Sequence, residues 1–391
     1  MRRLSISVLA VLLLCGQAVA DDGSAPRDVW VVRIAKKFIR GLTTLPPRLD
    51  TAWVQPSALP WSVNLENTLI RTGVDMHSDI TQVDAQPGGA VTTRSTLDNS
   101  LQKRLYFKLG SVIAYGSARL SYGFEASPKS PGKNTYFSFS NLGPSYGLQV
   151  NYYRINEYVD GVLAIEGLSD PFVFPSDEPG QLRTFSAEGF YAFNDSHFAY
   201  TAAYVGNVLQ RRSAGSWLVS AKYLQGDLVL NQDDAQFLAM TQGLGRYGTQ
   251  QVSAGAGYSY NWVPFHRQPD DLRTGRGLRN LTLNGTVLPM LAFYNYIRAF
   301  TYENGAEKAA VRFNGYPGLV LGVRAGLCFS WDRFYLTARF AYSRYGYHGA
   351  KYTTFTDGGR LRTDIGTRGV FYDLSGQALF GVKSFFLFVN F

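Results

Sequence analysis

The chain has 391 residues, with 38 Lys and Arg against 29 Asp and Glu, a formal net charge of +9, and 25 Tyr, 26 Phe and 40 Gly. With 46% hydrophobic residues it is too apolar for a disordered protein, and its two cysteines exclude a disulfide-rich or cysteine-zinc fold. An excess of Gly and Tyr beside only 17% charged residues favours many strands that face an apolar medium on one side.

The first twenty residues have the pattern of a secretory signal peptide. A short basic start precedes the apolar run Ser5–Leu14, and residues 18–20 (Ala-Val-Ala) form a small-residue cleavage site. We therefore predict a cleaved signal peptide over 1–20, with export from the cytoplasm of a Gram-negative cell. An uncleaved membrane anchor and a lipoprotein attached through Cys15 are the alternatives.

Residues 21–60 are predicted to form a periplasmic N-terminal segment with a short amphipathic helix at 27–41. At about 100° per residue, Trp30, Ile34 and Phe38 fall on one side of this helix, and its basic residues fall on the other. Such a helix can lie in a membrane interface, or it can pack over the periplasmic mouth of a barrel. The pattern does not choose between these two arrangements.

From residue 61 to residue 391 the dominant pattern is strict alternation. In Val252–Trp262 every second residue is apolar, and the residues between them are Ser, Gly or Asn. Since strand side chains alternate, this gives one apolar and one small polar face, with aromatic residues near the strand ends. We predict an all-β fold, an antiparallel transmembrane β-barrel of about twelve strands, with a soluble β-sandwich as the alternative. The predicted strands are Ser62–Val74, Lys103–Ala114, Ala118–Glu125, Thr135–Ser140, Ser145–Arg154, Arg183–Phe193, Trp217–Leu230, Gln251–Pro264, Asn280–Phe293, Gly318–Ser330, Arg333–Arg344 and Gly369–Phe391.

The connections between these strands alternate between long and short, as in porin-like outer-membrane barrels. The long ones are 75–102, 155–182, 231–250, 294–317 and 345–368, and the tight turns are 115–117, 141–144 and 331–332. We predict that the long connections face outward, and that the cell outer membrane is the location. The terminal Phe391 is the residue that barrel-assembly machinery is expected to read. Ten or fourteen strands are the alternative counts.

The segment 194–216 breaks this regularity, because it contains an alternating stretch of its own from Phe198 to Tyr204. A thirteenth strand would place the two ends of the barrel on opposite sides of the membrane. We therefore predict that 194–216 folds inward on the periplasmic side and lies in the lumen, where it would decide whether the barrel is open.

The same segment ends in two adjacent arginines flanked by serines: Arg211, Arg212, Ser213 and Ser216. Two arginines in a Gly/Ser turn can bind an anion or a phosphate bidentately. They can equally pair with Glu66 or Glu188 in the lumen and so hold the segment in place, which is the interpretation we favour.

Charged residues on the predicted strands are expected to face the lumen, because a basic side chain on the lipid face costs about 2–4 kcal/mol at the bilayer midplane. This inward set is Glu66, Arg104, Lys108, Arg119, Glu125, Glu188, Lys222, Arg324, Arg339 and Asp373. It predicts either a lumen sealed by ion pairs or a basic pore that attracts anions.

Several stretches together resemble a family of uncharacterised outer-membrane proteins of Bacteroidota-type bacteria, catalogued as a domain of unknown function. The most specific stretch is Gln210–Ser216, and the others are Leu49–Thr51 ahead of Pro60-Trp61, Ser145–Arg154, Tyr191–Tyr204 and Tyr258–Val263. The likeness extends from about Asp50 to the end and departs at the connection 264–279. The resemblance implies an outer-membrane barrel and no established activity, so no catalytic residues are carried over.

No nucleophile motif or cluster of metal ligands appears, and the four histidines are scattered. We predict no enzyme activity, no cofactor, no metal and no nucleic-acid partner; the expected partners are outer-membrane lipid and the assembly machinery. The predicted function is a narrow anion-preferring channel or a structural or surface protein. A lipid-modifying barrel enzyme and a surface-binding adhesin barrel are the alternatives.

Overall fold

The computed structural model describes residues 49–57, 59, 61–102, 105–125, 131–175, 178–230, 243–271, 275–303, 306–314, 318–347, 351–356 and 359–384. The chain divides into two compact units, Met1–Leu45 and Pro46–Phe391, and the description below concerns the second. The predicted signal peptide, the predicted helix 27–41, Arg104 and Phe391 lie outside the described residues. Within these ranges, no helix has the length and apolar character needed to cross a membrane.

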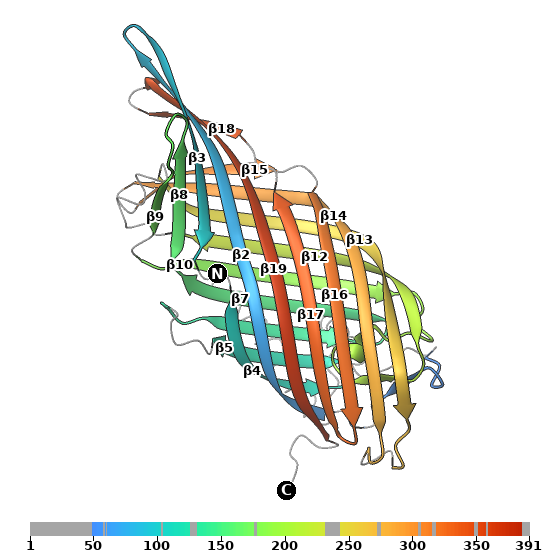
Figure 1. Cartoon of the computed structure of the whole chain (residues 1–391). Coiled ribbons are helices and arrows are strands. Elements are labelled where there is room, and N and C mark those ends of the chain that lie inside the picture. The colour runs from blue at the N-terminus through green and yellow to red at the C-terminus, as the bar shows by residue number, and fades with distance from the viewer. Residues whose placement is uncertain are drawn as a thin grey trace, which may run out of the picture. The chain divides into compact units, whose positions relative to one another are not determined.

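The described residues contain a closed ring of twelve antiparallel strands (Figure 1). Each strand pairs with the next, and the last pairs with the first over its whole length, from Trp61 opposite Ser384 to Asp84 opposite Leu361. The prediction of a twelve-stranded antiparallel barrel is confirmed. In ring order the strands are β2 (Trp61–Gln86), β4 (Tyr106–Tyr115), β5 (Ala118–Glu125), β6 (Thr135–Leu142), β7 (Tyr146–Glu157), β10 (Gly180–Ala192), β12 (Ala214–Val229), β13 (Leu244–Arg267), β14 (Arg279–Glu303), β16 (Gly318–Trp331), β17 (Phe334–Tyr347) and β19 (Leu361–Ser384).

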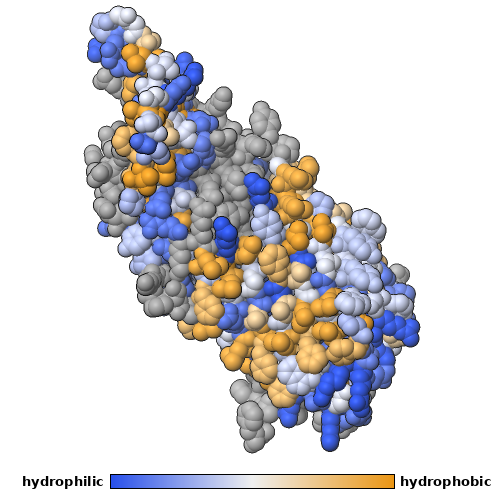
Figure 2. Space-filling view, in the orientation of Figure 1, coloured by the Kyte–Doolittle hydropathy of each residue, from blue (hydrophilic) through white to orange (hydrophobic). Residues whose placement is uncertain are grey.

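The alternation of the sequence matches the two faces of this ring. On β12, Trp217 is 63% exposed on the outer face, while Ser216 and Leu218 are buried on the inner face. Leu65 and Leu319 are likewise exposed on the outside, 72% and 69%. Exposed apolar side chains gather in a band around the strands, seen as orange in Figure 2. Because large apolar side chains rarely form such a continuous surface in water, this band marks an apolar environment.

Five further strands continue beyond the ring at one end: β3 (Gly89–Leu101), β8 (Val159–Ile165), β9 (Phe172–Pro175), β15 (Ala306–Asn314) and β18 (Lys351–Thr356). The β2–β3 hairpin, blue in Figure 1, turns at Gly88 and Gly89, whose φ angles of 123° and 142° favour glycine. Four of the five predicted long connections therefore contain strands: 75–102 contains β3, 155–182 contains β8 and β9, 294–317 contains β15, and 345–368 contains β18. β3 and β18 are rich in Thr, and this β-branched residue favours strands even where both faces are polar.

These additions distinguish the two ends of the ring. We call the end with the additional strands the hairpin end. At the other end, tight turns join β4 to β5, β6 to β7 and β16 to β17. The first residue of β2 and the last residue of β19 also lie at this end. We call it the tight-turn end. The predicted contrast between long and short connections is present.

Candidate functional site: the closed lumen

The lumen is closed at the tight-turn end by the chain itself. Between β10 and β12 the chain enters the ring and forms a 3-10 helix, η1 (Tyr200–Ala203), and a short strand, β11 (Val208–Gln210). We call residues 194–213 the plug. β11 pairs with β1 (Val54–Pro56), so the segment ahead of the barrel is part of this closure. The predicted inward fold is confirmed, and its alternating stretch is a helical turn in place of a thirteenth strand.

Polar side chains of the wall hold the plug by its backbone and hydroxyl groups. Arg324 Nη1 on β16 donates to the Tyr200 hydroxyl at 3.0 Å, and Asn261 Nδ2 on β13 donates to the Ala199 carbonyl at 2.7 Å. The Tyr204 hydroxyl donates to Asn284 on β14. Since these bonds come from three different strands, the plug has one defined position in the lumen.

Glycines make room for the plug. A Cβ on Gly326, on the inner face of β16, would lie 2.6 Å from the Tyr204 ring. Gly206 in the plug has a φ of 63°, and a Cβ there would lie 2.8 Å from the ring of Tyr335. A glycine on the lumen face and a glycine in the plug thus allow two buried tyrosines to pack against backbone.

Gln210 is the organising residue of the plug, and sequence reasoning did not single it out. Its side chain is fully buried. Oε1 accepts from the Ala199 amide at 2.9 Å and from Asn261 Nδ2 at 3.1 Å, while Nε2 donates to the carbonyls of His197 and Arg212 at 2.7 and 2.9 Å. Its place at the start of the distinctive 210–216 block was the available signal.

The two arginines of that block do not pair with Glu66 or Glu188, so the predicted partners are wrong, although both arginines do help to hold the segment in place. Arg211 Nη1 donates to the Thr51 carbonyl at 2.7 Å, and its amide donates to the Trp53 carbonyl at 2.7 Å. The Arg212 guanidinium lies 5.6 Å from the Trp53 ring centroid. Both residues attach the segment around β1 to the plug, because the turn points them toward the tight-turn mouth.

The two serines also have structural contacts. The Ser213 hydroxyl accepts from the Val263 amide at 2.9 Å, and the Ser216 hydroxyl accepts from the Asn194 amide at 3.0 Å. They fasten the two ends of the plug to β13 and β12, where the chain leaves and rejoins the wall.

Ion pairs satisfy two of the predicted lumen carboxylates, Glu66 and Glu188. Lys108 Nζ lies 2.6 Å from Glu66 Oε1, and both side chains are buried. Arg324 binds both oxygens of Glu188, and Lys222 Nζ lies 4.0 Å from the same carboxylate. Arg324 therefore joins a wall carboxylate to the plug hydroxyl of Tyr200.

The remaining members of the predicted inward set have other surroundings. Arg119 Nη1 donates to the Val205 carbonyl of the plug at 2.9 Å. Glu125 accepts from Asn134 near the hairpin end of β5. The side chain of Asp373 lies outside the described residues.

A cavity of about 130 Å³ lies above the plug, inside the ring. Its charged lining residues are Glu66, Lys108, Glu188, Lys222, Arg324 and Arg339. Four cations against two carboxylates leave an excess of two positive charges among the described residues. Arg339 on β17 is the distinctive member, since no described carboxylate lies within ion-pair distance of it and Glu66, which attracts it, is bonded to Lys108.

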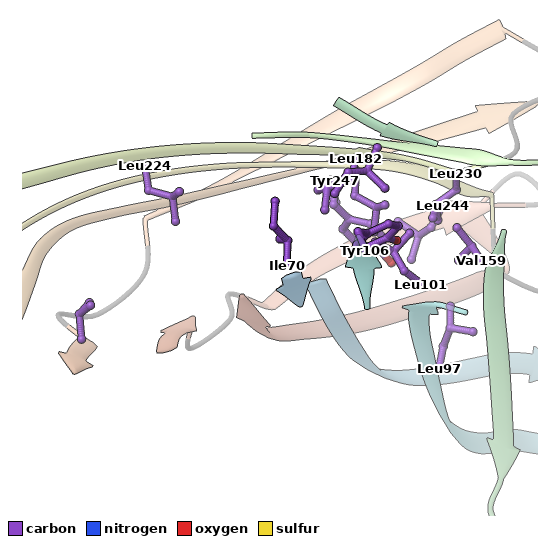
Figure 3. Packing of buried hydrophobic residues seen from close by; sticks show 14 of the residues in the cluster. Ile70, Leu97, Leu101, Tyr106, Val159, Leu182, Leu224, Leu230, Leu244 and Tyr247 are labelled. Atoms are coloured by element: carbon purple, nitrogen blue, oxygen red, sulfur yellow. The ribbon is translucent and has the colours of Figure 1, made fainter. Parts of the chain in front are cut away.

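At the hairpin end, apolar side chains close the lumen (Figure 3). They come from strands all around the ring and from β3 and β8, and we call them the outer cluster. Its fully or nearly fully buried members include Ile70, Ile80, Leu97, Leu101, Tyr106, Tyr136, Ile155, Val159, Leu182, Leu228, Leu244 and Val320. Asn99 Nδ2 on β3 donates to the Tyr247 hydroxyl on β13 at 3.4 Å, although the two strands are not neighbours. The contact crosses the mouth.

Two amides in this region have no hydrogen-bond partner. Gln251 on β13 and Asn295 on β14 are directly opposite in register and are 1% and 2% exposed. All four of their side-chain N and O atoms are buried without a partner. An unpaired buried polar group costs about 1–3 kcal/mol, so these two amides make an unfavourable contribution to the hairpin-end closure.

Among the described residues, no group of three or more His, Cys, Asp or Glu is arranged to hold a metal ion. The cavity therefore offers hydrogen-bond donors and guanidinium charge as its chemistry. Such groups recognise anions by ion pairing and bidentate hydrogen bonds.

The fold and site define a closed, twelve-stranded antiparallel barrel with an internal plug and a basic internal cavity. The family model described as a domain of unknown function (DUF4421) matches residues 74–368, and the chain belongs to this family. The match begins inside β2 and ends inside β19. No curated protein matches the chain.

Three solved structures are similar to this chain at low scores. A FadL homologue of Pseudomonas aeruginosa has 12% identity, covers 86% of this chain and 94% of its own, and has a TM-score of 0.21. OmpT of Vibrio cholerae has 9% identity, with 78% and 97% covered and a TM-score of 0.19. The Pseudomonas putida toluene transporter TodX has 7% identity, with 83% and 90% covered and a TM-score of 0.21. The barrel assignment rests on the strand pairing.

Proposed function

We propose that this protein is a gated, anion-preferring channel of the bacterial outer membrane, closed in the conformation described. The exposed apolar band supports the membrane location, because such a band faces lipid in membrane barrels. The closed ring supports it as well, since a closed barrel leaves no unpaired strand edge in lipid. The tight turns and the plug would then face the periplasm, and the hairpin end would face outward. The signal peptide predicted from the sequence agrees with this placement.

The observation that carries the proposal is the basic cavity between two closures. A barrel that served only as a scaffold would be expected to fill its lumen and balance its charges. Here the lining has an excess of two positive charges, and Arg339 faces the space without a carboxylate partner. In a low-dielectric wall such charge raises the local concentration of anions and rejects cations.

The two closures explain why the pore would be gated. The plug is bonded to the wall by Arg324 and Asn261, so it stays in place unless these bonds break. The outer cluster is held by non-directional apolar contacts and contains the unpaired amides of Gln251 and Asn295. Opening at the hairpin end would return these amides to water, which lowers the cost of exposing the apolar side chains.

Planar-bilayer recording on the refolded full chain tests the proposal. The natural sequence is expected to be silent or to open rarely. Replacing two plug tyrosines, Tyr200→Ala with Tyr204→Ala, should loosen the plug, so that each opening of the outer cluster gives anion-selective current. The matched control removes two tyrosines from the lipid face, Tyr258→Ala with Tyr260→Ala, and should stay silent.

Adding Arg339→Gln to the loosened plug should leave the current but move its reversal potential toward that of an unselective pore. Current without anion preference in the plug variant would contradict the proposal, as would porin-sized conductance of the natural sequence.

A structural or surface role is the second candidate. The continuation of the ring into β3, β8, β9, β15 and β18 beyond the apolar band favours it. In that case the plug variant stays silent even though its unfolding shows that the plug has loosened.

A further inference from the structure

A row of arginines crosses the outer face of the barrel where the apolar band ends. In the strand register, Arg154 on β7 lies opposite Arg183 on β10, which lies opposite Asp227 on β12. The row continues through Gly248 on β13 to Arg298 on β14. Arg154, Arg183 and Arg298 are all exposed. Adjacent strands are about 4.8 Å apart, so the row spans roughly 19 Å.

The row has more positive charge than its own carboxylate can balance. Asp227 is the only described carboxylate of the row. Arg246, two residues from Gly248 on β13, binds both oxygens of Asp227 at 2.7 and 2.9 Å. Arg183 donates only to Gln181, and no described partner contacts the Arg154 guanidinium. Four arginines against one aspartate leave an excess of three positive charges.

Arg154 and Arg183 are direct cross-strand neighbours on one face. Like charges in this arrangement destabilise an antiparallel pair. No described carboxylate forms an ion pair with either guanidinium, so an anion from outside the chain that bridges the two groups would relieve the repulsion between them. Guanidinium forks match the oxygens of a phosphate group.

The position of the row along the barrel axis indicates at which level of the membrane such a phosphate would lie. On the band side of the row lie aromatic side chains, with Phe185 and Tyr223 6.1 Å apart and Tyr294 and Tyr296 stacked at 6.5 Å. Aromatic residues mark the interface of a membrane barrel. On β10, eight residues separate Arg183 from Tyr191 at the tight-turn margin, about 26 Å along the strand at 3.3 Å per residue, or roughly 20 Å after tilting.

We propose that this arginine row is a binding site for the phosphate groups of an outer-leaflet lipid, specifically a phosphorylated lipid A. The inference rests on the proposed placement in the outer membrane with the hairpin end outward. The row is on the hairpin side of the apolar band, where the headgroups of the outer leaflet begin. Lipid A carries more than one phosphate on a rigid sugar frame, which suits a linear row better than a single-phosphate headgroup does.

The test measures lipid binding by native mass spectrometry on the refolded full chain in detergent. The probes are bisphosphorylated lipid A, the same lipid after removal of its phosphates, and phosphatidylglycerol. We expect the natural sequence to bind bisphosphorylated lipid A at least tenfold more tightly than either other lipid. Equal binding of the dephosphorylated form would overturn the site, and equal binding of phosphatidylglycerol would overturn the choice of lipid A.

The test variant is Arg154→Gln/Arg183→Gln/Arg298→Gln, which should lose at least tenfold in lipid A affinity. The matched control, Arg267→Gln/Arg276→Gln/Arg333→Gln, removes the same charge from exposed positions at the tight-turn end and should stay within twofold. Unchanged affinity in the test variant, or an equal loss in the control, would overturn the proposal.

A single substitution gives a second readout if the triple variant does not fold. Without phosphorylated lipid, Arg183→Gln should raise the thermal unfolding midpoint slightly because it removes the repulsion. With lipid A present it should lower the midpoint relative to the natural sequence. The same sign under both conditions would contradict the site. Because binding is measured on refolded protein, this result is independent of conductance, and cell fractionation separately tests the membrane location.

Discussion

The two ends of the lumen are closed by different physical means. At the tight-turn end the plug is held by directional hydrogen bonds, among them Arg324 to Tyr200 and Asn261 to Ala199. At the hairpin end the outer cluster is apolar and contains the unpaired amides of Gln251 and Asn295. A directional network specifies one geometry, whereas apolar contacts tolerate rearrangement. If the barrel is gated as proposed, the hairpin end is the end expected to open more readily.

The largest expected effect follows from breaking the link between wall and plug. Arg324→Met leaves Glu188 buried with Lys222, 4.0 Å away, as its remaining described countercharge, and removes a bond to Tyr200. Removing one partner of a buried pair costs about 3–5 kcal/mol. Urea unfolding of the refolded barrel, followed by tryptophan fluorescence, should show this loss.

The matched control for this variant adds Glu188→Leu, which removes the uncompensated charge. Most of the lost stability should return in the double variant. A single variant that unfolds at the same urea concentration as the natural sequence would mean that the plug is not anchored through Arg324.

The next effect concerns packing in the outer cluster. Leu182 on β10 is fully buried there, and Leu182→Ala should cost about 2–5 kcal/mol because it leaves a cavity. The same urea experiment measures the loss, and bilayer recording should show more frequent opening. Leu182→Met keeps the volume and should cost less than about 1.5 kcal/mol. If both variants behave alike, the cluster does not close the lumen by packing.

A smaller effect of opposite sign is expected at the unpaired amides. Replacing Gln251 and Asn295 together by leucine removes buried groups that lack partners, which each cost about 1–3 kcal/mol. The variant should unfold at higher urea and open less often. Gln149→Leu is the contrast, because the Gln149 amide donates to Asn151 at 3.1 Å and its loss should destabilise. Destabilisation by the leucine pair would show that these amides have partners in the native state.

The smallest effect is a pH dependence at the tight-turn end. Asp332, in the turn between β16 and β17, accepts from the Gly277 amide at 2.8 Å and from Arg279 at 3.1 Å. The hydrogen bond from the Gly277 backbone amide is the main cause that lowers the pKa of the Asp332 carboxyl below its ordinary value of 3.8. The hydrogen bond and positive charge of Arg279 lower this pKa further. Its contribution to stability is therefore present above about pH 4 and is lost as pH falls through the lowered pKa.

Asp332→Asn keeps a residue that tolerates the φ of 48° and removes the charge. Its unfolding midpoint, measured from pH 2 to 6 (about the carboxyl range), should vary less with pH than that of the natural sequence. An identical slope would show that Asp332 makes no such contribution.

The strands could be predicted closely because their signal is local. The period-two pattern of Val252–Trp262 lies within β13, and the predicted Ala118–Glu125 coincides with β5. The strand ends beyond the apolar band were not predicted. β3 and the part of β2 near the hairpin end are polar on both faces, so their sequences do not alternate. The segment 194–216 was placed in the lumen by a parity argument, which uses the whole ring.

The alternating pattern predicts which side chains face the lumen and which face outward, because a strand fixes that choice for every residue once one face is apolar. Which lumen residues contact one another depends on the three-dimensional arrangement of the strands. Glu188 and Arg324 are 136 residues apart, and their pairing depends on how a ring of twelve strands closes around the plug. For the same reason, Arg211 contacts Thr51 and Arg212 contacts Trp53, and neither pairs with a lumen carboxylate. Contacts across a lumen depend on strand stagger and tilt, which no local pattern encodes.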